Sequence, residues 1–290
     1  MGGTTLPSAP NNPPLLLVDG HNLLWGATFG FPAEIRSRDK TRLLTGLFGF
    51  FALLRVAIRD DIAQAPEVIV VFDGQYGSTD RAEMDPTYKA QRPTDAAALA
   101  PIQFLPDVKG GLDQCGISWT ELDHAEADDV IAAIVHRTPE PRPILLMSRD
   151  RDYYQLVTDR ISVLNTKMRA GHRHIGPTQV YERHQVTPAQ WADYRALTGD
   201  PADNIPGVHG IGAKTAATLL AGGLTLDDLA AAGRLDTGRG RTVREQFDLA
   251  LKWRDMIRLN HDLDVTVKVA GEASPPLPRP AEVVEALNLW

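Results

Sequence analysis

Short runs of consecutive apolar residues alternate, in the first half of the chain, with segments of helical spacing. The runs lie at residues 15–19 (LLLVD), 68–73 (VIVVFD) and 144–148 (ILLMS). Unbroken apolar runs of this length are typical of strands that are buried on both faces of a parallel sheet. We expect three such strands here and a weaker fourth strand at residues 161–165.

Between these runs, apolar residues recur every three or four positions, as on one face of a helix. Residues 41–59 and 126–136 show this pattern clearly. Buried strands that alternate with amphipathic helices form layered α/β structures. The pattern therefore predicts an α/β fold with a mainly parallel central sheet flanked by helices.

In the second half of the chain, predicted helices follow one another without intervening strands. They are expected at residues 188–198, 213–220, 226–231 and 242–260. We divide the chain into a disordered tail (1–14), an α/β domain (15–180) and a helical domain (181–290). Within the helical domain, residues 233–241 (GRLDTGRGR) are expected to be an exposed loop, and residues 271–280 a linker to a short closing segment.

Residues 75–106 interrupt the strand and helix pattern with polar residues, four prolines and an alanine cluster. Segments of this length without regular structure are usually functional or disordered. Two bases there, Lys89 and Arg92, could neutralise a phosphate, and the ring of Tyr88 could stack on an unpaired base. A solvated loop would explain the same residues equally well.

Composition narrows the class of protein. Of the 290 residues, 43% are hydrophobic and 23% are charged, as in ordinary folded soluble proteins. The single cysteine, Cys115, can form no internal disulfide, which fits a reducing cytoplasm. The longest apolar stretch, at residues 43–58, contains Arg55 and is shorter than the roughly 20 residues of a membrane span. With no signal peptide at the N-terminus, we expect a cytoplasmic protein that does not enter membranes.

Aspartates stand where the clearest predicted strands end. Asp19 closes the first strand, Asp73 closes the second, and Asp150 and Asp152 follow the third. In an open parallel sheet, the carboxyl ends of the strands border the crevice in which ligands bind. We therefore expect these four carboxylates to face one crevice.

Two further acidic groups accompany them. One lies at the start of a predicted helix, where the helix dipole favours negative charge, and the other lies in a turn-rich segment. Their members are Glu126, Asp128 and Asp129 in the first group, and Asp200 and Asp203 in the second. Taken one at a time, all of these residues could be turn residues or helix caps.

Nine carboxylates in one crevice would repel each other unless cations lay between them. Oxygen ligands without cysteine select Mg²⁺ or Mn²⁺ rather than zinc. Two such ions about 3.5 to 4 Å apart are suited to the hydrolysis of a phosphodiester. The chain has 37 acids and 30 bases, so the nine carboxylates exceed its whole net charge of −7. That net charge therefore does not argue against a nucleic-acid partner.

Residues 207–216 (GVHGIGAKTA) lie between two predicted helices. Glycines allow the backbone to approach a phosphate closely, and free N–H groups at a helix start with a nearby lysine form an anion site. The pattern resembles a helix-hairpin-helix motif, which binds the DNA backbone without reading its sequence. The residues that would form this site are Gly207, Gly210, Gly212, Lys214 and Thr215.

Together, these motifs resemble the bacterial 5′ nucleases, the flap endonuclease and 5′-3′ exonuclease family that also forms the N-terminal domain of bacterial DNA polymerase I. The resemblance spans residues 15–270. Its segments, each with its first residue, are VDGHNLLW (Val18), VVFDG (Val70), YKAQR (Tyr88), EADDVIA (Glu126), SRDRDYYQLV (Ser148) and QWADYRALTGDPADNIPGVHGIGAKTA (Gln190).

The resemblance implies two divalent metal ions with separate ligand sets. The ion nearer the attacking water would be held by Asp19, Asp73, Glu126 and Asp128. The second would be held or supported by Asp129, Asp150, Asp152, Asp200 and Asp203. Residues 75–106 would form a helical arch through which a single-stranded 5′ end threads, with Lys89 and Arg92 at the scissile phosphate. The hairpin would also bind K⁺ through backbone oxygens at Val208 and Ile211.

Departures from the family pattern are small: Arg151 stands where a lysine is expected and Ala202 where a polar residue is expected, and neither removes a metal ligand. We expect a monomeric, nucleoid-associated nuclease, freestanding or excised from a longer chain, that acts on DNA with 5′ flaps, nicks or single-stranded 5′ ends. Whether a DNA polymerase or a sliding clamp recruits it stays open. Two alternatives remain: a catalytically idle branched-DNA binding protein and a PIN-like ribonuclease.

Overall fold

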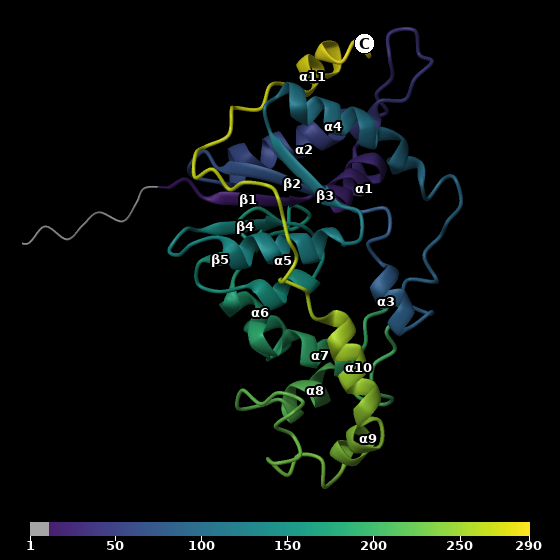
Figure 1. The fold of residues 1–290 in the computed structure, drawn as a ribbon, viewed down its shortest axis with the longest axis vertical. Helices are drawn as coiled ribbons and strands as arrows, with labels where there is room; N and C mark the ends of the chain where they lie inside the picture. The colour runs from purple at the N-terminus through teal and green to yellow at the C-terminus, as the bar shows by residue number, and fades with distance from the viewer. Residues whose placement is uncertain (1–11) are drawn as a thin grey trace, which may run out of the picture.

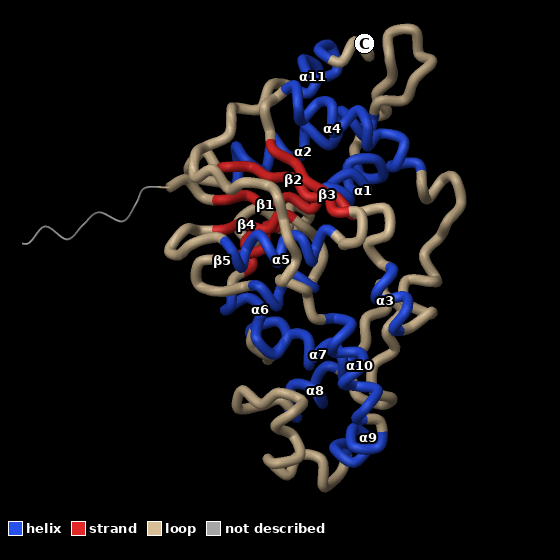
Figure 2. The backbone as a smooth tube through the Cα atoms, viewed as in Figure 1, coloured by secondary structure: helices blue, strands red, loops and turns tan. Residues whose placement is uncertain are grey.

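The computed structural model describes residues 12–290, so most of the tail expected at residues 1–14 lies outside the described residues. A six-stranded sheet forms the centre of the molecule (Figure 2). Its strands are β1 (Leu15–Asp19), β2 (Glu67–Asp73), β3 (Ser118–Leu122), β4 (Ile144–Met147), β5 (Ile161–Leu164) and β6 (His174–Ile175). Their spatial order is β3-β2-β1-β4-β5-β6, and every pair is parallel except β5 and β6. The expected mainly parallel sheet is confirmed.

Side chains of β1 alternate between two hydrophobic cores, one on each face of the sheet. Leu15 and Leu17 belong to the core that includes α5 (Ala127–Arg137). Leu16 and Val18 belong to the opposite core, beneath α1 (Gly20–Gly30), α2 (Thr45–Asp61) and α4 (Leu105–Gln114). Because both faces are covered, as Figure 1 shows, the central strands can consist of unbroken apolar runs.

The helical half lies below the face of the sheet that α5 covers (Figure 1). Its helices are α6 (Pro177–His184), α7 (Trp191–Thr198), which follows the 3₁₀ helix η3 (Pro188–Gln190), α8 (Ala213–Leu219), α9 (Arg239–Glu245) and α10 (Phe247–Ile257). Helix α7 packs against both α8 and α10. No helix within residues 12–290 combines the length and the apolar character needed to cross a membrane.

Two of the helix predictions in this half are wrong. Residues 226–231 form consecutive turns, in which Asp228 and Leu229 donate backbone hydrogen bonds to residues three positions earlier. Leu226 and Leu229 are nevertheless buried, so the apolar spacing that suggested a helix is satisfied by turns. The single helix expected at residues 242–260 is divided between α9 and α10 at Gln246.

After α10 the chain returns to the sheet as an extended strap, residues 258–279, which passes over α5 (Figure 1). Arg137 of α5 donates hydrogen bonds to the backbone carbonyls of Leu263 and Val265. The chain then forms α11 (Pro280–Ala286), which packs against α2 and α4. The closing segment, expected to belong to the helical domain, therefore lies on the α/β half.

Residues 75–106 run along one side of the molecule from the helical half back to α4 (Figure 1). They contain only a short helix, α3 (Thr79–Met84), a series of turns and the 3₁₀ helix η1 (Ala100–Phe104). The expected helical arch is therefore mostly irregular. The prolines at 86 and 93 lack the N–H that helix continuation requires, which accounts for the interruption.

Candidate active site

The strand order reverses at β1, because β2 and β3 lie on one side of it and β4 and β5 lie on the other. In open α/β sheets, ligands bind at this switch point, beyond the carboxyl ends of the strands. Asp19 ends β1 and Asp150 follows β4. Ser148 links the two, since its hydroxyl donates to Asp19 at 3.0 Å and accepts from the Asp150 backbone N–H at 3.1 Å.

A cleft of about 610 Å³ opens at this position. Carboxylates from four separate segments line it: Asp19, Asp73, Glu126, Asp128 and Asp150. The remaining wall consists of His21, Asn22 and Trp25 of α1, Tyr153, and several residues of the 75–106 segment, among them Lys89, Arg92, Leu99 and Ile102. The cleft therefore has an acidic floor and a basic and apolar rim.

Asp19 has two roles at the start of α1. Its carboxylate caps the helix by accepting the Asn22 backbone N–H at 3.0 Å, and it also accepts a 3.3 Å hydrogen bond from the Tyr153 hydroxyl. Burial, reinforced by the negative charges of Asp73 and Asp150, raises the pKa of Asp19 to about 7. A nearby cation would remove this penalty.

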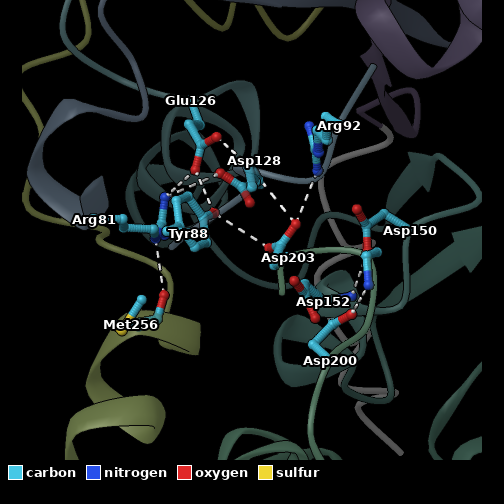
Figure 3. Close-up of polar contacts among 12 residues, drawn as sticks. Arg81, Tyr88, Arg92, Glu126, Asp128, Asp150, Asp152, Asp200, Asp203 and Met256 are labelled. Carbon is cyan, nitrogen blue, oxygen red and sulfur yellow. Dashed lines mark hydrogen bonds and ion pairs between the residues drawn. The ribbon is translucent and has the colours of Figure 1, made fainter. Parts of the chain in front are cut away.

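The second group of carboxylates surrounds Arg81 of α3 (Figure 3). Arg81 donates to Glu126 at 2.6 Å and forms two 2.8 Å hydrogen bonds with Asp129. Asp129 also accepts the Asn260 backbone N–H at 2.8 Å. Both oxygens of Asp129 are thus bound within the protein, and Asp129 is not among the residues that line the cleft.

Glu126 and Asp128 differ in their electrostatic environment. Burial alone would raise the pKa of Glu126, but the charges of Lys89 and Arg81 outweigh this effect and lower it. Burial, together with the charge of Asp129, raises the pKa of Asp128 well above its usual range. Arg81 and Lys89 thus compensate the charge of Asp128 less completely than that of Glu126.

Asp152, Asp200 and Asp203 form a third group beside Asp150 (Figure 3). Asp200 forms an ion pair with Arg195, and Asp203 accepts a 2.8 Å hydrogen bond from Arg92. Burial raises the pKa of Asp152 well above its usual range, and the charges of Asp150, Asp200 and Asp203 raise it further. One oxygen of Asp152, Oδ1, is buried and has no hydrogen-bond partner among the described residues.

Tyr88 and Lys89 are held by carboxylates of the site. Tyr88 is only 6% exposed, and its hydroxyl lies 2.9 Å from a carboxylate oxygen of Glu126 and 3.2 Å from one of Asp203, the two acceptors for its single proton. In this arrangement the ring of Tyr88 is not available to stack on an unpaired base, which was one of the roles that the sequence left open for it. Lys89, with a positive φ of 54°, points its ammonium group at Glu126. The base of the 75–106 segment is therefore tied to the carboxylates.

The donor set suits hard divalent cations. Within residues 12–290 no three acidic, histidine or cysteine side chains already surround a common point as metal ligands. However, the raised pKa of Asp19, Asp128 and Asp152 and the unpartnered Asp152 oxygen show that the negative charge exceeds the internal compensation. Oxygen-only ligands of this kind fit Mg²⁺ or Mn²⁺.

The glycine hairpin lies in the helical half, between α7 and α8. Gly207 has φ +72°, and a Cβ there would lie 2.3 Å from the Gly199 backbone nitrogen, so only glycine fits. Val208 and Ile211 have buried side chains, and the Ile211 N–H donates to the Val208 carbonyl at 3.0 Å. No neighbouring atom lies within 4 Å of a Cβ placed on Gly212, so that side of the backbone is open to a ligand.

Lys214 and Thr215 continue this surface into the first turn of α8. Lys214 is exposed and Thr215 is partly exposed. Gly210, Gly212, Lys214 and Thr215 are therefore accessible, whereas Gly207, Val208 and Ile211 are buried behind them. The acidic candidates gather in and beside the cleft.

The sequence did not point to several residues that shape the cleft. Arg81 lies in a segment where nothing in the sequence distinguishes it from a solvated base. Arg149 donates to the Asn22 carbonyl at 2.8 Å and lies over α1, where a Cβ on Gly26 would be 1.9 Å from its Nη2. This contact joins Gly26 to an arginine more than a hundred residues later in the chain, so no local sequence pattern predicts it.

A parallel sheet with an acidic cleft at its switch point, joined to a helical half that carries a glycine hairpin, is the arrangement of the 5′ nuclease fold. Two family models match the chain. The model for the N-terminal, resolvase-like domain of 5′-3′ exonucleases matches residues 14–185, and the model for their C-terminal SAM fold matches residues 186–276. The chain belongs to the 5′-3′ exonuclease family, whose members are metal-dependent nucleases.

The curated relatives are much longer than this chain. The thermostable DNA polymerase I of Thermus thermophilus is 36% identical over 270 residues, which are 90% of this chain and 30% of the polymerase. The DNA polymerase I of Deinococcus radiodurans is 36% identical over 266 residues, which are 90% of this chain and 26% of the polymerase. The chain thus spans less than a third of the length of each of these two relatives.

Solved structures share the fold at lower identity. The 5′-exonuclease of bacteriophage T5, solved with divalent zinc ions, superimposes with a TM-score of 0.67 at 24% identity, over 85% of this chain and 89% of that chain. The flap endonuclease-1 of Methanococcus jannaschii does so with a TM-score of 0.58 at 17% identity, over 95% of this chain and 86% of that chain. The expected 5′ nuclease fold is confirmed.

Proposed function

We propose that this protein hydrolyses DNA phosphodiesters at 5′ flaps, nicks and single-stranded 5′ ends during replication and repair, using two divalent metal ions. One observation carries the proposal: carboxylates from separate segments line one cleft, and among those in and beside it the buried Asp19 and Asp152 have no cationic partner within the described residues. Such an arrangement is costly unless cations bind there.

The ligands of the metal nearer the attacking water are proposed to be Asp19, Asp73, Glu126 and Asp128. For the second metal we propose Asp150, Asp152, Asp200 and Asp203, with Asp129 in a supporting role because both of its oxygens are bound to the protein. When bound, the two ions would lower the pKa of an attacking water and stabilise the leaving oxygen.

Lys89 and Arg92 are proposed to bind the scissile phosphate. Both now contact site carboxylates, Glu126 and Asp203 respectively. A phosphate that enters the cleft offers them an equivalent negative partner. The 75–106 segment, which forms the rim of the cleft, is then the element past which a single-stranded 5′ end threads.

The hairpin is proposed to hold the duplex beside the cleaved strand, through the open backbone at Gly210 and Gly212 and through Lys214. A potassium ion bound by the carbonyls of Val208 and Ile211 would add a positive charge at the same place. We further propose that the protein acts as a monomer near the nucleoid, where a DNA polymerase or a sliding clamp can recruit it.

The test is a cleavage panel on end-labelled DNA with a flap, a nick or a gap, with titration of Mg²⁺ and Mn²⁺. Asp150→Asn should lower the cleavage rate by at least about a thousand-fold, because it removes a charged ligand at the reacting centre. Its affinity for flap DNA should stay near that of the wild type. Asp159→Asn, the same change at an exposed position, is the matched control and should cleave normally.

The panel also separates the two alternatives. A catalytically idle DNA-binding protein would bind flap DNA and cleave nothing at any metal concentration. A PIN-like ribonuclease would cleave single-stranded RNA and gain nothing from a duplex beside the cleaved strand. Retained cleavage by Asp150→Asn would refute the metal assignment.

A further inference from the structure

A second concave surface lies in the helical half, away from the acidic cleft. This groove, of about 760 Å³, runs between α8 and the loop that precedes α9, and it shares no residue with the cleft. Its polar wall consists of Thr215, Thr218, Arg234, Thr237 and Arg239. No carboxylate lines it, although the chain as a whole has a net charge of −7. The groove is therefore basic in an acidic protein.

Arg239 joins this groove to the glycine hairpin. A Cβ placed on Gly210 would lie 3.1 Å from Nη1 of Arg239 and 3.8 Å from its Cζ, so the guanidinium lies directly on the hairpin backbone. Gly210 has φ +75° and lacks the side chain that would push the arginine away. The arginine and the hairpin thus form one continuous surface.

The charge of Arg239 is available to a ligand. Within residues 12–290 no carboxylate lies within ion-pairing distance of Arg239, whereas Arg244, in the same helix, is paired with Asp236. Arg239 is also exposed. On the same groove, Arg234 uses one nitrogen for a 3.4 Å hydrogen bond to the Ala221 carbonyl. Its other nitrogens remain for a partner.

We propose that Arg239, together with Arg234, forms a further phosphate-binding site for the backbone of duplex DNA, and that this groove extends the footprint of the hairpin. The inference rests on the proposed function. Guanidinium groups bind phosphate oxygens through paired hydrogen bonds, and threonine hydroxyls add further donors. An open basic groove continuous with a backbone-binding hairpin fits a polyanion of repeating phosphates, and such contacts position a duplex without reading its sequence.

The experiment measures binding of a fluorescent flap duplex in EDTA, by anisotropy, as a function of KCl. Arg239→Ala should weaken binding about tenfold near 0.1 M salt and reduce the slope of log affinity against log salt by about one. Arg239→Lys should keep most of the slope. The matched control is Arg241→Ala, which removes the same charge two residues away at an exposed position outside the groove. It should change the affinity less than twofold.

Cleavage of a single strand without a duplex should be the same in the wild type and in Arg239→Ala, because only the duplex reaches the groove. The difference between them in flap binding should disappear when the duplex arm is made too short to reach the hairpin.

If wild-type protein cleaves flaps but Arg239→Ala has an unchanged affinity and salt slope, this inference alone fails. Equal losses in Arg239→Ala and Arg241→Ala would also overturn it, since a general charge effect would then suffice. A wild type that neither binds nor cleaves DNA would refute the proposed function as well.

Discussion

Two buried charged clusters lie at opposite ends of the same sheet, and they differ in how completely they are neutralised. At the amino end, Glu67 forms a 2.7 Å ion pair with Arg142 and accepts the backbone N–H groups of Ala270 and Gly271. At the carboxyl end, Asp19 and Asp152 have raised pKa values, and Asp152 has an unpartnered oxygen.

The degree of neutralisation distinguishes charged residues that stabilise the fold from charged residues that are available to bind a ligand. Glu67 and Arg142 form an ion pair, although Nη2 of Arg142 makes no hydrogen bond among the described residues, and Glu67 fastens the returning strap to the start of β2. The carboxylates of the cleft have fewer partners than they need, although Arg81, Lys89 and Arg92 neutralise some of them. Such a deficit is relieved either by protonation, as for Asp19 below its raised pKa, or by bound cations, so it marks the place where divalent cations would be most stabilising.

The largest effect on stability is expected from Glu67→Gln. This change leaves the charge of Arg142 buried without a partner, and it should lower the free energy of unfolding by about 3 kcal/mol. Urea denaturation measures the loss, and the cleavage rate of the remaining folded protein should be unchanged. Glu272→Gln, at an exposed position of the same strap, should change stability by less than about 0.5 kcal/mol. Equal effects of the two changes would contradict the structural role of Glu67.

Mg²⁺ should stabilise the protein only through the acidic cluster at the carboxyl end of the sheet. At a concentration 100 times its dissociation constant, Mg²⁺ should stabilise the wild type by about 2.7 kcal/mol, because it binds only the folded protein. Glu67→Gln should keep this increment, whereas Asp152→Asn should lose most of it and be no less stable than the wild type in EDTA. Thermal unfolding with and without Mg²⁺ measures both. A full increment in Asp152→Asn would show that this carboxylate does not take part in metal binding.

The smallest expected effect is a dependence of the free energy of unfolding on pH. In EDTA, folded Asp19 has a pKa near 7 because of burial and the charges of Asp73 and Asp150, whereas its ordinary value is 3.8. Between these values the folded form holds a proton that the unfolded chain releases, so stability falls as pH rises towards 7. Since Asp73 is 43% exposed and therefore screened, we expect a loss on the order of 1 kcal/mol between pH 5 and pH 8. Asp19→Asn should reduce this dependence in urea titrations, while Asp128 and Asp152, whose pKa values are also raised, keep the remainder. A wild-type stability that rises over the same range would contradict the argument.

The sheet could be predicted where its strands are buried on both faces. Apolar runs located β1, β2, β4 and β5 to within a residue or two, because such runs can be accommodated only in the middle of a covered sheet. The two edge strands, β3 (SWTEL) and the two-residue β6 (HI), were missed, since neither contains an apolar run. Helix ends in the second half were less accurate, because buried leucines at helical spacing can also be accommodated by turns.

The candidate site was predicted in part. Aspartates at the ends of parallel strands must approach one another, so Asp19, Asp73 and Asp150 could be grouped from the chain order alone. The pairing of Arg81 with Asp129 joins α3 to α5, and no local pattern contains it. For Tyr88 the sequence left base stacking and a solvated loop open, and the structure shows a buried hydrogen-bond donor to Glu126.

By itself, the sequence determined which residue types stand at the ends of the strands and at the hairpin, because apolar periodicity and glycine positions act over a few neighbouring residues. Only the tertiary structure decided which charges are neutralised: Glu67 by Arg142, Asp129 by Arg81, and Asp152 by no other residue of the described chain. The physical reason is that neutralisation depends on distances of a few ångströms between side chains that are far apart in the chain, and those distances exist only after the layers have packed.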